Sequence, residues 1–484
     1  MPTTWTPPVP ADTEQHDPAL VFEAGERNHH ISNTAYPIAH NKTWGSYRVP
    51  KAQHLEAVKK SFDSIDDLCL YAHIPFCEVR CAFCEYTVVG RSELPLTKQY
   101  MGWLNRELGM YREWLNTTAR TLHGFDIGGG TPSFVEAELI AELVENARRS
   151  FKWAPVSAIS IETTPRIAAA EPTKIEAYTK AGIERISMGI QVIQPDLLKV
   201  LNRDGNGVEH HFKAVEHIRR AGFKKFNVDL MYGFYGQSLE SWRATLEHAI
   251  SLKPEYITLY RMRYKLTKIS DQAPHVHMQQ VREQAALAKK LLADAGFLAN
   301  PGKNTYSSIP GDVGTSDYLK RRVIDGIPYL GIGLGSQSMT HTSISYNDGA
   351  VGKNLAPYQR SVEAGVPPVQ DLYDLPIQHM MAKMIAVSFY FGEINYESFR
   401  NKFGIDVEAA FPAQIAWLKA NGYMHDTGKC LSMTPEGAKH FNGVIAQFFA
   451  PSVQAYLIAR DPANADDFDL NRKAALNVAR AKSA

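Results

Sequence analysis

Short β-branched runs alternate with amphipathic stretches from about residue 67 to residue 265, and this alternation restricts the fold more than any other feature. Six runs are predicted to be strands: Leu68–Ile74, Gly124–Ile127, Ala158–Glu162, Arg185–Gln191, Lys225–Met231 and Tyr256–Tyr260. The intervening stretches have helical spacing: Leu96–Leu115, Glu136–Arg149, Lys174–Ala181, Val208–Ala221 and Leu239–Leu252. Repeated strand–helix units form a parallel sheet whose loops at the strand carboxyl ends carry the chemistry. The sequence therefore predicts an α/β fold, a partial or full barrel.

The flanking segments lack this repeat. Apolar residues at helical spacing fill Leu375–Phe389 and Val407–Asn421, and Gly428–Met433 has the pattern of a wing-like hairpin. We predict four regions: an N-terminal extension or lid at 1–66, a barrel at 67–345, a helical, winged-helix-like C-terminal cap at 346–460, and a flexible tail at 461–484.

Composition excludes several classes of function. The 484 residues carry 52 Lys and Arg against 51 Asp and Glu, a net charge of +1, which argues against binding to nucleic acid or a membrane surface. No apolar run is long enough to span a bilayer, and the Pro- and Thr-rich start has no signal-peptide pattern. We therefore expect a cytoplasmic protein without a membrane segment.

The five cysteines are too few for a disulfide scaffold, but their placement is informative. Cys77, Cys81 and Cys84 lie within eight residues, directly after a predicted strand, whereas Cys69 and Cys430 stand apart and are predicted to be packing residues. Such a trio favours a [4Fe–4S] cluster held by three thiolates at the barrel mouth. Zinc, with His73 as a fourth ligand, is the alternative, although zinc sites usually pair CxxC knuckles.

The run His73-Ile-Pro-Phe-Cys77, followed by Cys81 and Cys84, resembles the radical S-adenosylmethionine (SAM) enzymes, and more narrowly their oxygen-independent coproporphyrinogen III oxidase-like (HemN-like) branch. Further motifs of that branch follow the predicted strands: Gly128–Ser133, Ser160–Glu162, Ser187–Gln191, Asn227–Gly233 and Tyr329–Ser338. The resemblance covers roughly residues 30–450. It implies a partial (β/α)6 TIM-like radical SAM barrel with an N-terminal extension and the cap.

The resemblance also implies a cofactor site. A three-cysteine [4Fe–4S] cluster leaves one iron open to bind S-adenosylmethionine. The positions that match the family's cofactor contacts are Tyr71, Gly129, Gly130, Thr131, Glu162, Gln191, Arg203 and Asp229. Their chemistry suits the ligand: Glu162 for ammonium or ribose, Arg203 for carboxylate, and Asp229 for hydroxyls. Arg263 and Gln337 stand where the family places contacts to a second S-adenosylmethionine.

Two N-terminal segments are candidates for closing this site. Asn33–Pro37 resembles a segment that precedes the barrel of the oxidase and helps close its site, or it is a simple structural strap. Phe22–His30 is a candidate lid, although its residue types require no such role, and His29 and His30 are expected to be solvated.

This chain departs from the oxidase pattern where substrate and second cofactor would meet. Glu85-Tyr86-Thr87 replaces Gly-Cys-Asn, Val192 replaces an Asp, and Arg261–Tyr264 replaces Tyr-Ala-His. These departures favour a resemblance to the class C radical methyltransferases and cyclopropanases. In that reaction a 5′-deoxyadenosyl radical takes hydrogen from the methyl group of a second S-adenosylmethionine. The resulting methylene radical adds to an sp² carbon.

Candidate acid and base residues for such a reaction are Tyr86, Glu85 and Tyr264. The resemblance implies as partners an aromatic or tetrapyrrole substrate, an electron donor such as flavodoxin or ferredoxin, and, for a methyl product, a partner methyltransferase. Neither nucleic acid nor a membrane is expected.

Two other functions stay open. One is tetrapyrrole chemistry, either oxidative decarboxylation of coproporphyrinogen III or radical methylation and opening of haem. Arg261 and Arg263 are suited to binding propionates in that case. The other is a haem-binding chaperone on a related barrel, although the complete cluster motif argues against a chaperone.

Overall fold

The structure is a computed structural model. It describes residue 12 and residues 14–29, 31–32, 36, 40–264, 267–300, 303–312, 314–389 and 392–460. The predicted tail at 461–484, His30 and, apart from Tyr36, the segment Asn33–Pro37 lie outside the described residues.

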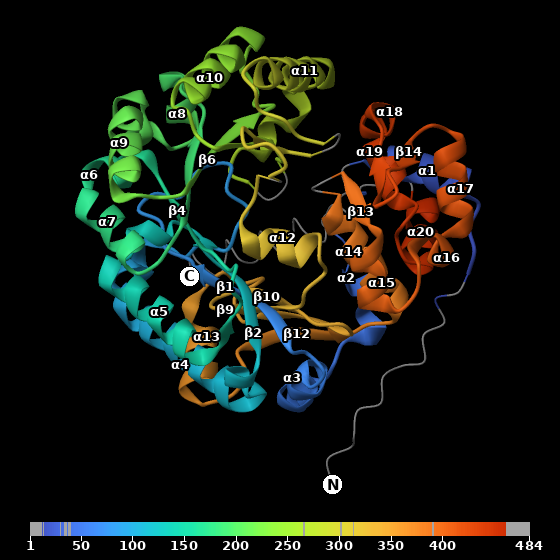
Figure 1. Ribbon diagram of the computed structural model, residues 1–484, viewed down its shortest axis with the longest axis horizontal. Coiled ribbons are helices and arrows are strands. Elements are labelled where there is room, and N and C mark those ends of the chain that lie inside the picture. The colour runs from blue at the N-terminus through green and yellow to red at the C-terminus, as the bar shows by residue number, and fades with distance from the viewer. Residues whose placement is uncertain are drawn as a thin grey trace.

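Two sheets organise the described part of the chain (Figure 1). The larger, twelve-stranded sheet contains β1 (Asp67–Ile74), β2 (Thr121–Gly129), β3 (Lys152–Trp153), β4 (Ile159–Thr163), β5 (Arg185–Gln191), β6 (Lys225–Tyr232), β7 (Tyr256–Arg261), β8 (Thr305–Ser307), β9 (Tyr329–Ile332), β10 (Gln337–Met339), β11 (Ser343–Asn347) and β12 (Val369–Asp374). The smaller sheet contains β13 (Glu393–Asn395), β14 (Met424–Asp426) and β15 (Cys430–Met433).

The helices fall into three groups along the chain. The N-terminal group is α1 (Pro18–Arg27), α2 (His40–Thr43) and α3 (His54–Phe62). The barrel group is α4 (Thr97–Leu115), α5 (Ala137–Ser150), α6 (Pro165–Ala170), α7 (Pro172–Lys180), α8 (Pro195–Val200), α9 (His211–Ala221), α10 (Leu239–Ser251), α11 (Met278–Asp294), α12 (Asp317–Val323) and α13 (Leu355–Glu363). The C-terminal group is α14 (Ile377–Ser388), α15 (Tyr396–Phe403), α16 (Val407–Ala410), α17 (Pro412–Ala420), α18 (Pro435–Lys439), α19 (Phe441–Ala446) and α20 (Pro451–Ala459).

The predicted parallel sheet is confirmed. β1, β2, β4, β5, β6 and β7 pair in that order, all parallel, and correspond one to one to the six predicted strands. Their cores are buried because each strand packs under a helix, which is typical of βαβ units. The helices α4 to α11 form the outer ring of a partial barrel (Figure 1). The carboxyl ends of the six strands therefore meet at one mouth.

The sheet continues further than the sequence pattern indicated. β9 pairs parallel to β1, and β10, β11 and β12 follow it as antiparallel strands, while β8 pairs antiparallel to β7 at the other edge. These strands have only three to six residues, too few for a clear alternating pattern, so periodicity did not reveal them. The predicted boundary at residue 345 stays a prediction, and β12, at 369–374, belongs to the barrel's sheet.

The helix α12 lies against the inner side of β1 and β2, between the barrel and the C-terminal group (Figure 1). A Cβ atom at Gly124 of β2 would lie 2.4 Å from the backbone nitrogen of Tyr318, so glycine is needed for this close approach. Ser316, which caps α12, also donates a hydrogen bond to Asp126 of β2 at 2.6 Å. The helix α12 is thus held in place and forms the floor of the barrel below the mouth.

The C-terminal segment has helices around a three-stranded antiparallel sheet, including the predicted hairpin β14–β15. The expected single helix at 407–421 is wrong. It is two helices, because Pro412 begins a new helix and Phe411 before it leaves the helical region at φ −132°, ψ 53°.

The N-terminal helix α1 packs on this C-terminal segment, against α19 and α20, rather than on the barrel mouth (Figure 1). Phe22 stacks on Tyr423 with ring centroids 4.9 Å apart, and Gly25 approaches Gly443 closely. The described part of the candidate lid, residues 22–29, therefore packs mainly as part of the cap's core. Within the described residues, no helix is both long enough and apolar enough to cross a bilayer.

A buried carboxylate joins α4 to the turn after β9. Glu107 is fully buried and accepts hydrogen bonds from Gly333 N at 2.7 Å, Asn347 Nδ2 at 2.7 Å and Tyr358 Oη at 2.6 Å. Burial raises the pKa of Glu107 to about 7. This one side chain satisfies three donors that have no access to water, so it fixes β9 beside β1.

Replacing Glu107 by Leu should lower the melting temperature of the chain by about 5 °C. Three buried donors would then be left unpaired, at about 1 kcal/mol or more each. Thermal unfolding followed by circular dichroism measures the shift. Glu113→Leu, at an exposed position of the same helix, is the matched control and should change the melting temperature little. Equal melting temperatures for the two variants would show that the network contributes nothing.

Candidate active site at the barrel mouth

The three clustered cysteines lie on the loop that follows β1. Cys77, Cys81 and Cys84 are partly buried free thiols. The loop is held from two sides, because Ala82 N donates to Leu201 O at 2.9 Å and Lys268 N donates to Ala82 O at 2.9 Å. These bonds come from the segments after β5 and β7. The loop therefore crosses the mouth of the barrel, as the sequence predicted.

His73 of β1 fastens the far end of this loop. Its Nε2 lies 2.7 Å from the carbonyl oxygen of Thr87, and its Nδ1 lies 3.1 Å from the hydroxyl of Tyr71. Burial lowers the pKa of His73 to about 4, so the ring is neutral, with Nε2–H as donor and Nδ1 as acceptor. Both ring nitrogens form hydrogen bonds within the protein. His73 is therefore not available as the fourth ligand that the zinc interpretation required.

The glycine run at the end of β2 lets its backbone approach the cysteine loop. A Cβ atom at Gly130 would lie 2.6 Å from the carbonyl oxygen of Phe76 and 3.0 Å from Cys77 Sγ. Gly129 has φ +124°, a conformation that side chains rarely adopt, and its Cβ would meet the His73 ring at 2.8 Å. Only glycine fits at both positions. The two predicted cofactor-binding glycines thus border the cysteine loop.

Two side chains contact the thiols directly. Thr131 Oγ1 lies 3.4 Å from Cys77 Sγ, and Arg203 Nη1 lies 3.2 Å from Cys81 Sγ. Arg203 is almost fully buried, at 8% exposure, and also donates to the carbonyl of Gly189. Both were predicted as cofactor contacts from motif position. A guanidinium beside a thiol stabilises the thiolate form that binds iron.

Gln191 ends β5 in a strained conformation. Its φ is +69°, in the left-handed region, and a bulge shifts the β5–β6 register between Gly189 and Gln191. Among the described residues, its Oε1 atom is buried without a hydrogen-bond partner, as is the Nε atom of Arg203. Strain and unpaired buried polar atoms together mark a place prepared for a ligand.

Two acidic side chains face each other inside the mouth. Glu162 ends β4 and accepts a hydrogen bond from Gly129 N at 3.2 Å, and Asp229 of β6 accepts bonds from Ser187 and Asn227 at 2.8 Å each. Burial raises the pKa of Glu162 to about 7, with Asp229 contributing, and burial also raises the pKa of Asp229. A cation or a set of hydroxyl groups between them would lower the free-energy cost of keeping both carboxylates ionised there.

These residues fit a cluster with S-adenosylmethionine. Burial raises the pKa of the Cys77 thiol to about 12, so the positive charge of iron is needed to replace its proton. In the described part of the chain, no three His, Cys, Asp or Glu side chains surround a single ion. A four-iron cluster does not require that spacing, because each thiolate binds a different iron. Glu162, Asp229, Gln191 and Arg203 supply the acceptors and donors of a zwitterionic ligand.

The other predicted site residues lie at the rim and are engaged by the protein. Arg263, after β7, forms an ion pair with Glu85, after β1. The Tyr264 hydroxyl donates to Gly233 O at 3.2 Å and accepts from Tyr235 N at 2.8 Å, and so fixes the turn after β6. Gln337 accepts a hydrogen bond from Tyr329, away from the Glu162 and Asp229 pair. Their predicted catalytic and second-cofactor roles stay predictions.

Tyr86 occupies the most exposed of these positions, at 61% exposure. Lys353 binds the backbone carbonyls of Glu85 and Tyr86, at 2.7 Å and 3.0 Å. Lys353 therefore holds the backbone of the segment after the third cysteine in place.

Sequence reasoning missed a layer of polar residues below the cofactor site. Asp126 of β2 pairs with Ser160 of β4, two residues before Glu162, and burial raises the pKa of Asp126 to about 6. Tyr318 of α12 packs 5.9 Å from the Tyr71 ring. An Asp in the middle of an apolar strand was the one signal that pointed to Asp126. Nothing in the sequence pattern brought Tyr318 into the barrel.

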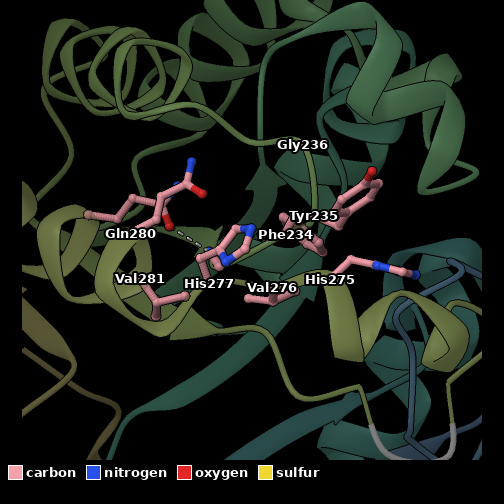
Figure 2. A pocket seen from close by; sticks show the side chains of 10 residues that line it. Phe234, Tyr235, Gly236, His275, Val276, His277, Gln280 and Val281 are labelled. Carbon is pink, nitrogen blue, oxygen red and sulfur yellow. Dashed lines mark hydrogen bonds between the residues drawn. The ribbon is translucent and has the colours of Figure 1, made fainter.

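A hollow opens beside the mouth, after β6 (Figure 2). It is lined by the turn Gly233–Gly236, by His275 and His277, and by the first turns of α11, including Gln280. The Tyr235 ring lies 5.6 Å from the His275 ring, and both surround this hollow in Figure 2. Its volume is about 210 Å³, too small to enclose a molecule the size of a porphyrin but large enough for part of one.

Replacing Cys81 by Ala should leave a folded chain that cannot hold a complete cluster, because one of three thiolates is lost. We expect less than half of the wild-type iron after anaerobic reconstitution, measured by iron analysis and by the cluster's visible absorbance. Cys430→Ala is the matched control, since Cys430 is buried in the small C-terminal sheet. Full iron loading of the Cys81 variant would contradict the ligand assignment.

Affinity for S-adenosylmethionine should rise with pH around neutrality. Glu162, with a pKa of about 7, is protonated below that pH and ionised above it, and only the carboxylate attracts an ammonium group. We expect Kd to fall about tenfold from roughly pH 6 to pH 8. Equilibrium dialysis with the oxidised, unreactive enzyme measures it. Glu162→Gln should bind weakly with no such slope, whereas exposed Glu142→Gln should keep it. A slope that persists in Glu162→Gln would assign it to another group.

Comparison with known proteins agrees with this geometry. Residues 71–249 match the model of the radical SAM superfamily, and residues 391–439 match that of the HemN C-terminal domain. The heme chaperone HemW of Haemophilus influenzae is 36% identical over 198 residues, which are 40% of this chain and 51% of that protein. The chain thus spans about half the length of that relative.

Two further comparisons cover more of the chain. Anaerobic coproporphyrinogen III oxidase 1 of Cereibacter sphaeroides is 29% identical over 69% of this chain and 74% of its own. The solved structure of coproporphyrinogen III oxidase (HemN) from Escherichia coli has a TM-score of 0.69, with 23% identity over 86% of this chain and 96% of that one. The second likeness shows the fold alone. From its cysteine loop, its barrel and these matches, the chain contains a radical SAM domain followed by a HemN C-terminal domain, the pair that matches the HemN-like branch, and the radical SAM match implies a [4Fe–4S] cluster and S-adenosylmethionine.

Proposed function

We propose that this protein cleaves S-adenosylmethionine reductively and directs the resulting 5′-deoxyadenosyl radical at a tetrapyrrole. The observation that carries the proposal is the match to a coproporphyrinogen III oxidase over 69% of this chain and 74% of that protein. When bound, the cluster supplies the electron that breaks the C–S bond of S-adenosylmethionine. The chain's own residues bind that cofactor and keep water out of the mouth.

The roles of the chain's residues follow from their positions. Arg203 and Gln191 orient the ligand from β5 and the loop after it, and Glu162 with Asp229 hold its ammonium or hydroxyl groups. The hollow after β6 accepts part of the substrate against Tyr235 and the two imidazoles of His275 and His277 (Figure 2). The reducing electron comes from a small donor protein such as flavodoxin or ferredoxin.

Methyl or methylene transfer to an sp² carbon is the second candidate. Two of the departures from the oxidase pattern, Glu85 and Arg263, form an ion pair with each other across the mouth. Both residues of this ion pair differ from the oxidase pattern, although their loops are far apart in sequence. This favours the interpretation that the rim binds a different substrate or a second S-adenosylmethionine. For Arg263 to contact a second cofactor, this ion pair would have to open, and a partner methyltransferase would complete a methyl product.

Isotope transfer distinguishes these reactions. Reconstituted enzyme is given dithionite, coproporphyrinogen III and S-adenosylmethionine deuterated in its methyl group, under anaerobic conditions. We expect decarboxylated porphyrinogen, together with 5′-deoxyadenosine that carries no deuterium, because the radical takes hydrogen from the substrate. Mass spectrometry reads both products.

Other results would replace the proposal. Deuterium in 5′-deoxyadenosine would show abstraction from a second cofactor's methyl group and establish the transfer reaction instead. A Soret shift on haem titration, with 5′-deoxyadenosine no higher than the background without substrate, would favour a haem-binding chaperone. The Cys81→Ala variant is the control for background cleavage.

A further inference from the structure

The hollow after β6 is lined by side chains whose hydrogen-bonding groups the protein leaves unused (Figure 2). Tyr235, His275 and His277 are exposed. Within the described part of the chain, neither the Tyr235 hydroxyl nor any ring nitrogen of the two histidines forms a hydrogen bond. An imidazole keeps at least one N–H donor, neutral or protonated, and a phenol has one O–H donor. None of the described residues that line the hollow is acidic, so no carboxylate of the protein occupies these donors.

Side-chain amides keep this hollow in shape. Gln280 and Gln284, near the start of α11, both donate to the carbonyl oxygen of Gln237, at 2.9 Å and 2.8 Å. Gln284 also accepts a hydrogen bond from Gly233 N at 3.1 Å. Gln237 and Gln284 are almost completely buried. The turn after β6 and the start of α11 are therefore fixed to each other, and a ligand would enter a cavity that already exists.

An arginine side chain passes beside the wall of the hollow. Arg261 ends β7 and pairs in register with Tyr232, the residue before Gly233. A Cβ atom at Gly233 would lie 3.7 Å from Arg261 Cγ and 3.6 Å from Val281 Cγ2, and Val281 lines the hollow. Arg261 is exposed and forms no ion pair with any other described residue. Because a guanidinium does not titrate in proteins, this charge is available to an anion at any working pH.

The helix α11 adds a second source of positive potential. It has 17 residues, and its first turn contains no acidic residue and has no side-chain cap. The first N–H groups of a helix have no partner within it, and the helix dipole favours an anion at this end. His277, at the N-cap position, and Gln280, in the first turn, both line the hollow. The amino end of α11 thus reinforces the preference of the cavity for a negative group.

We propose that this hollow binds a carboxylate group, and that Arg261 sets this preference. A carboxylate has two oxygens in one plane, which match a guanidinium fork, and it also accepts from imidazole and phenol donors. The volume of about 210 Å³ is several times the share of one water molecule in the liquid, about 30 Å³, so a carboxylate on a short carbon chain has room. Phe234, Val276 and Val281 give the hollow apolar walls, which suit the methylene groups of such a chain.

The hollow lies next to the cysteine loop, with one aromatic layer between them. Phe234 lines the hollow, and its ring centroid lies 6.1 Å from that of Phe83, which directly precedes Cys84. A larger molecule that places one carboxylate here can extend to the mouth. A tetrapyrrole with carboxyalkyl side chains has that shape, and for the identity of this bearer the inference rests on the proposed function. The carboxylate site itself rests on the residues around the hollow.

Histidine footprinting on the full reconstituted chain tests the site directly. Diethylpyrocarbonate labels exposed imidazoles, and mass spectrometry reads His275 and His277 separately from His425, an exposed histidine of the C-terminal sheet. The probes are coproporphyrin III, its tetramethyl ester and propionate. At ten times Kd, coproporphyrin III should slow the labelling of His275 and His277 about tenfold, because a single site is then about nine-tenths occupied. The ester should not protect them, and His425 should label at the same rate throughout.

The three probes separate the sources of the carboxylate. Protection by coproporphyrin III but not by its ester assigns the site to a substrate side chain. Protection by propionate but by neither porphyrin assigns it to a free small acid. Equal protection by coproporphyrin III and its ester, or by none of the probes, would overturn the proposal. The isotope experiment above reads the reaction independently, so a failure of the proposed reaction and a failure of this site are distinguishable.

Substitution of Arg261 tests its role. Arg261→Met should raise the Kd of coproporphyrin III about tenfold, as expected for the loss of a hydrogen-bonded charge pair. Quenching of porphyrin fluorescence measures the constant. Arg360→Met is the matched control, since Arg360 is exposed on α13, and it should keep the wild-type Kd. The same Kd in Arg261→Met and in the wild type would overturn the role given to Arg261.

Discussion

The position of β1 between β2 and β9 is the constraint on which the site depends. The backbone of β1 pairs with a strand on each side. The hydroxyl of Tyr100 donates to the His73 carbonyl oxygen at 2.6 Å and so fixes the carboxyl end of β1. The side chain of His73 then holds Thr87, so both ends of the cysteine loop are tied to one strand. A loop tied in this way presents three thiolates to one side at little entropic cost when iron binds.

The mouth combines positive and negative groups that the fold keeps apart. Arg203 lies beside the Cys81 thiol. Glu162 and Asp229 lie on β4 and β6, the two strands that flank β5. A zwitterionic ligand with a carboxylate at one end and cationic groups elsewhere matches this separation. Because Arg203 is buried and Asp229 is partly buried, the field that they exert on a ligand is stronger than it would be in water. The bulge at Gln191 interrupts the pairing of β5 with β6 at the mouth.

Local pattern was sufficient for the six parallel strands, the cysteine loop and the glycine run, since each depends on neighbours within about ten residues. It failed where contacts are long-range. The helix α12 enters the barrel because Gly124 leaves room for Tyr318, almost two hundred residues away in sequence. Lys383 has the pattern of an ordinary helix residue, and only the packing of α14 against α12 buries it. Ion pairs such as that between Glu85 and Arg263 likewise cannot be predicted from the hydrophobic periodicity of the sequence.

The ion pair between Glu85 and Arg263 lies apart from the residues proposed to bind the cofactor. Those residues lie at or near strand ends, where the sheet fixes their spacing. The pair sits on loops, where side chains change without disturbing the barrel. An exposed ion pair contributes little to stability, so its role is to set the shape and charge of the rim. If the proposed function holds, substitutions at the rim should redirect the radical to another substrate without abolishing its formation.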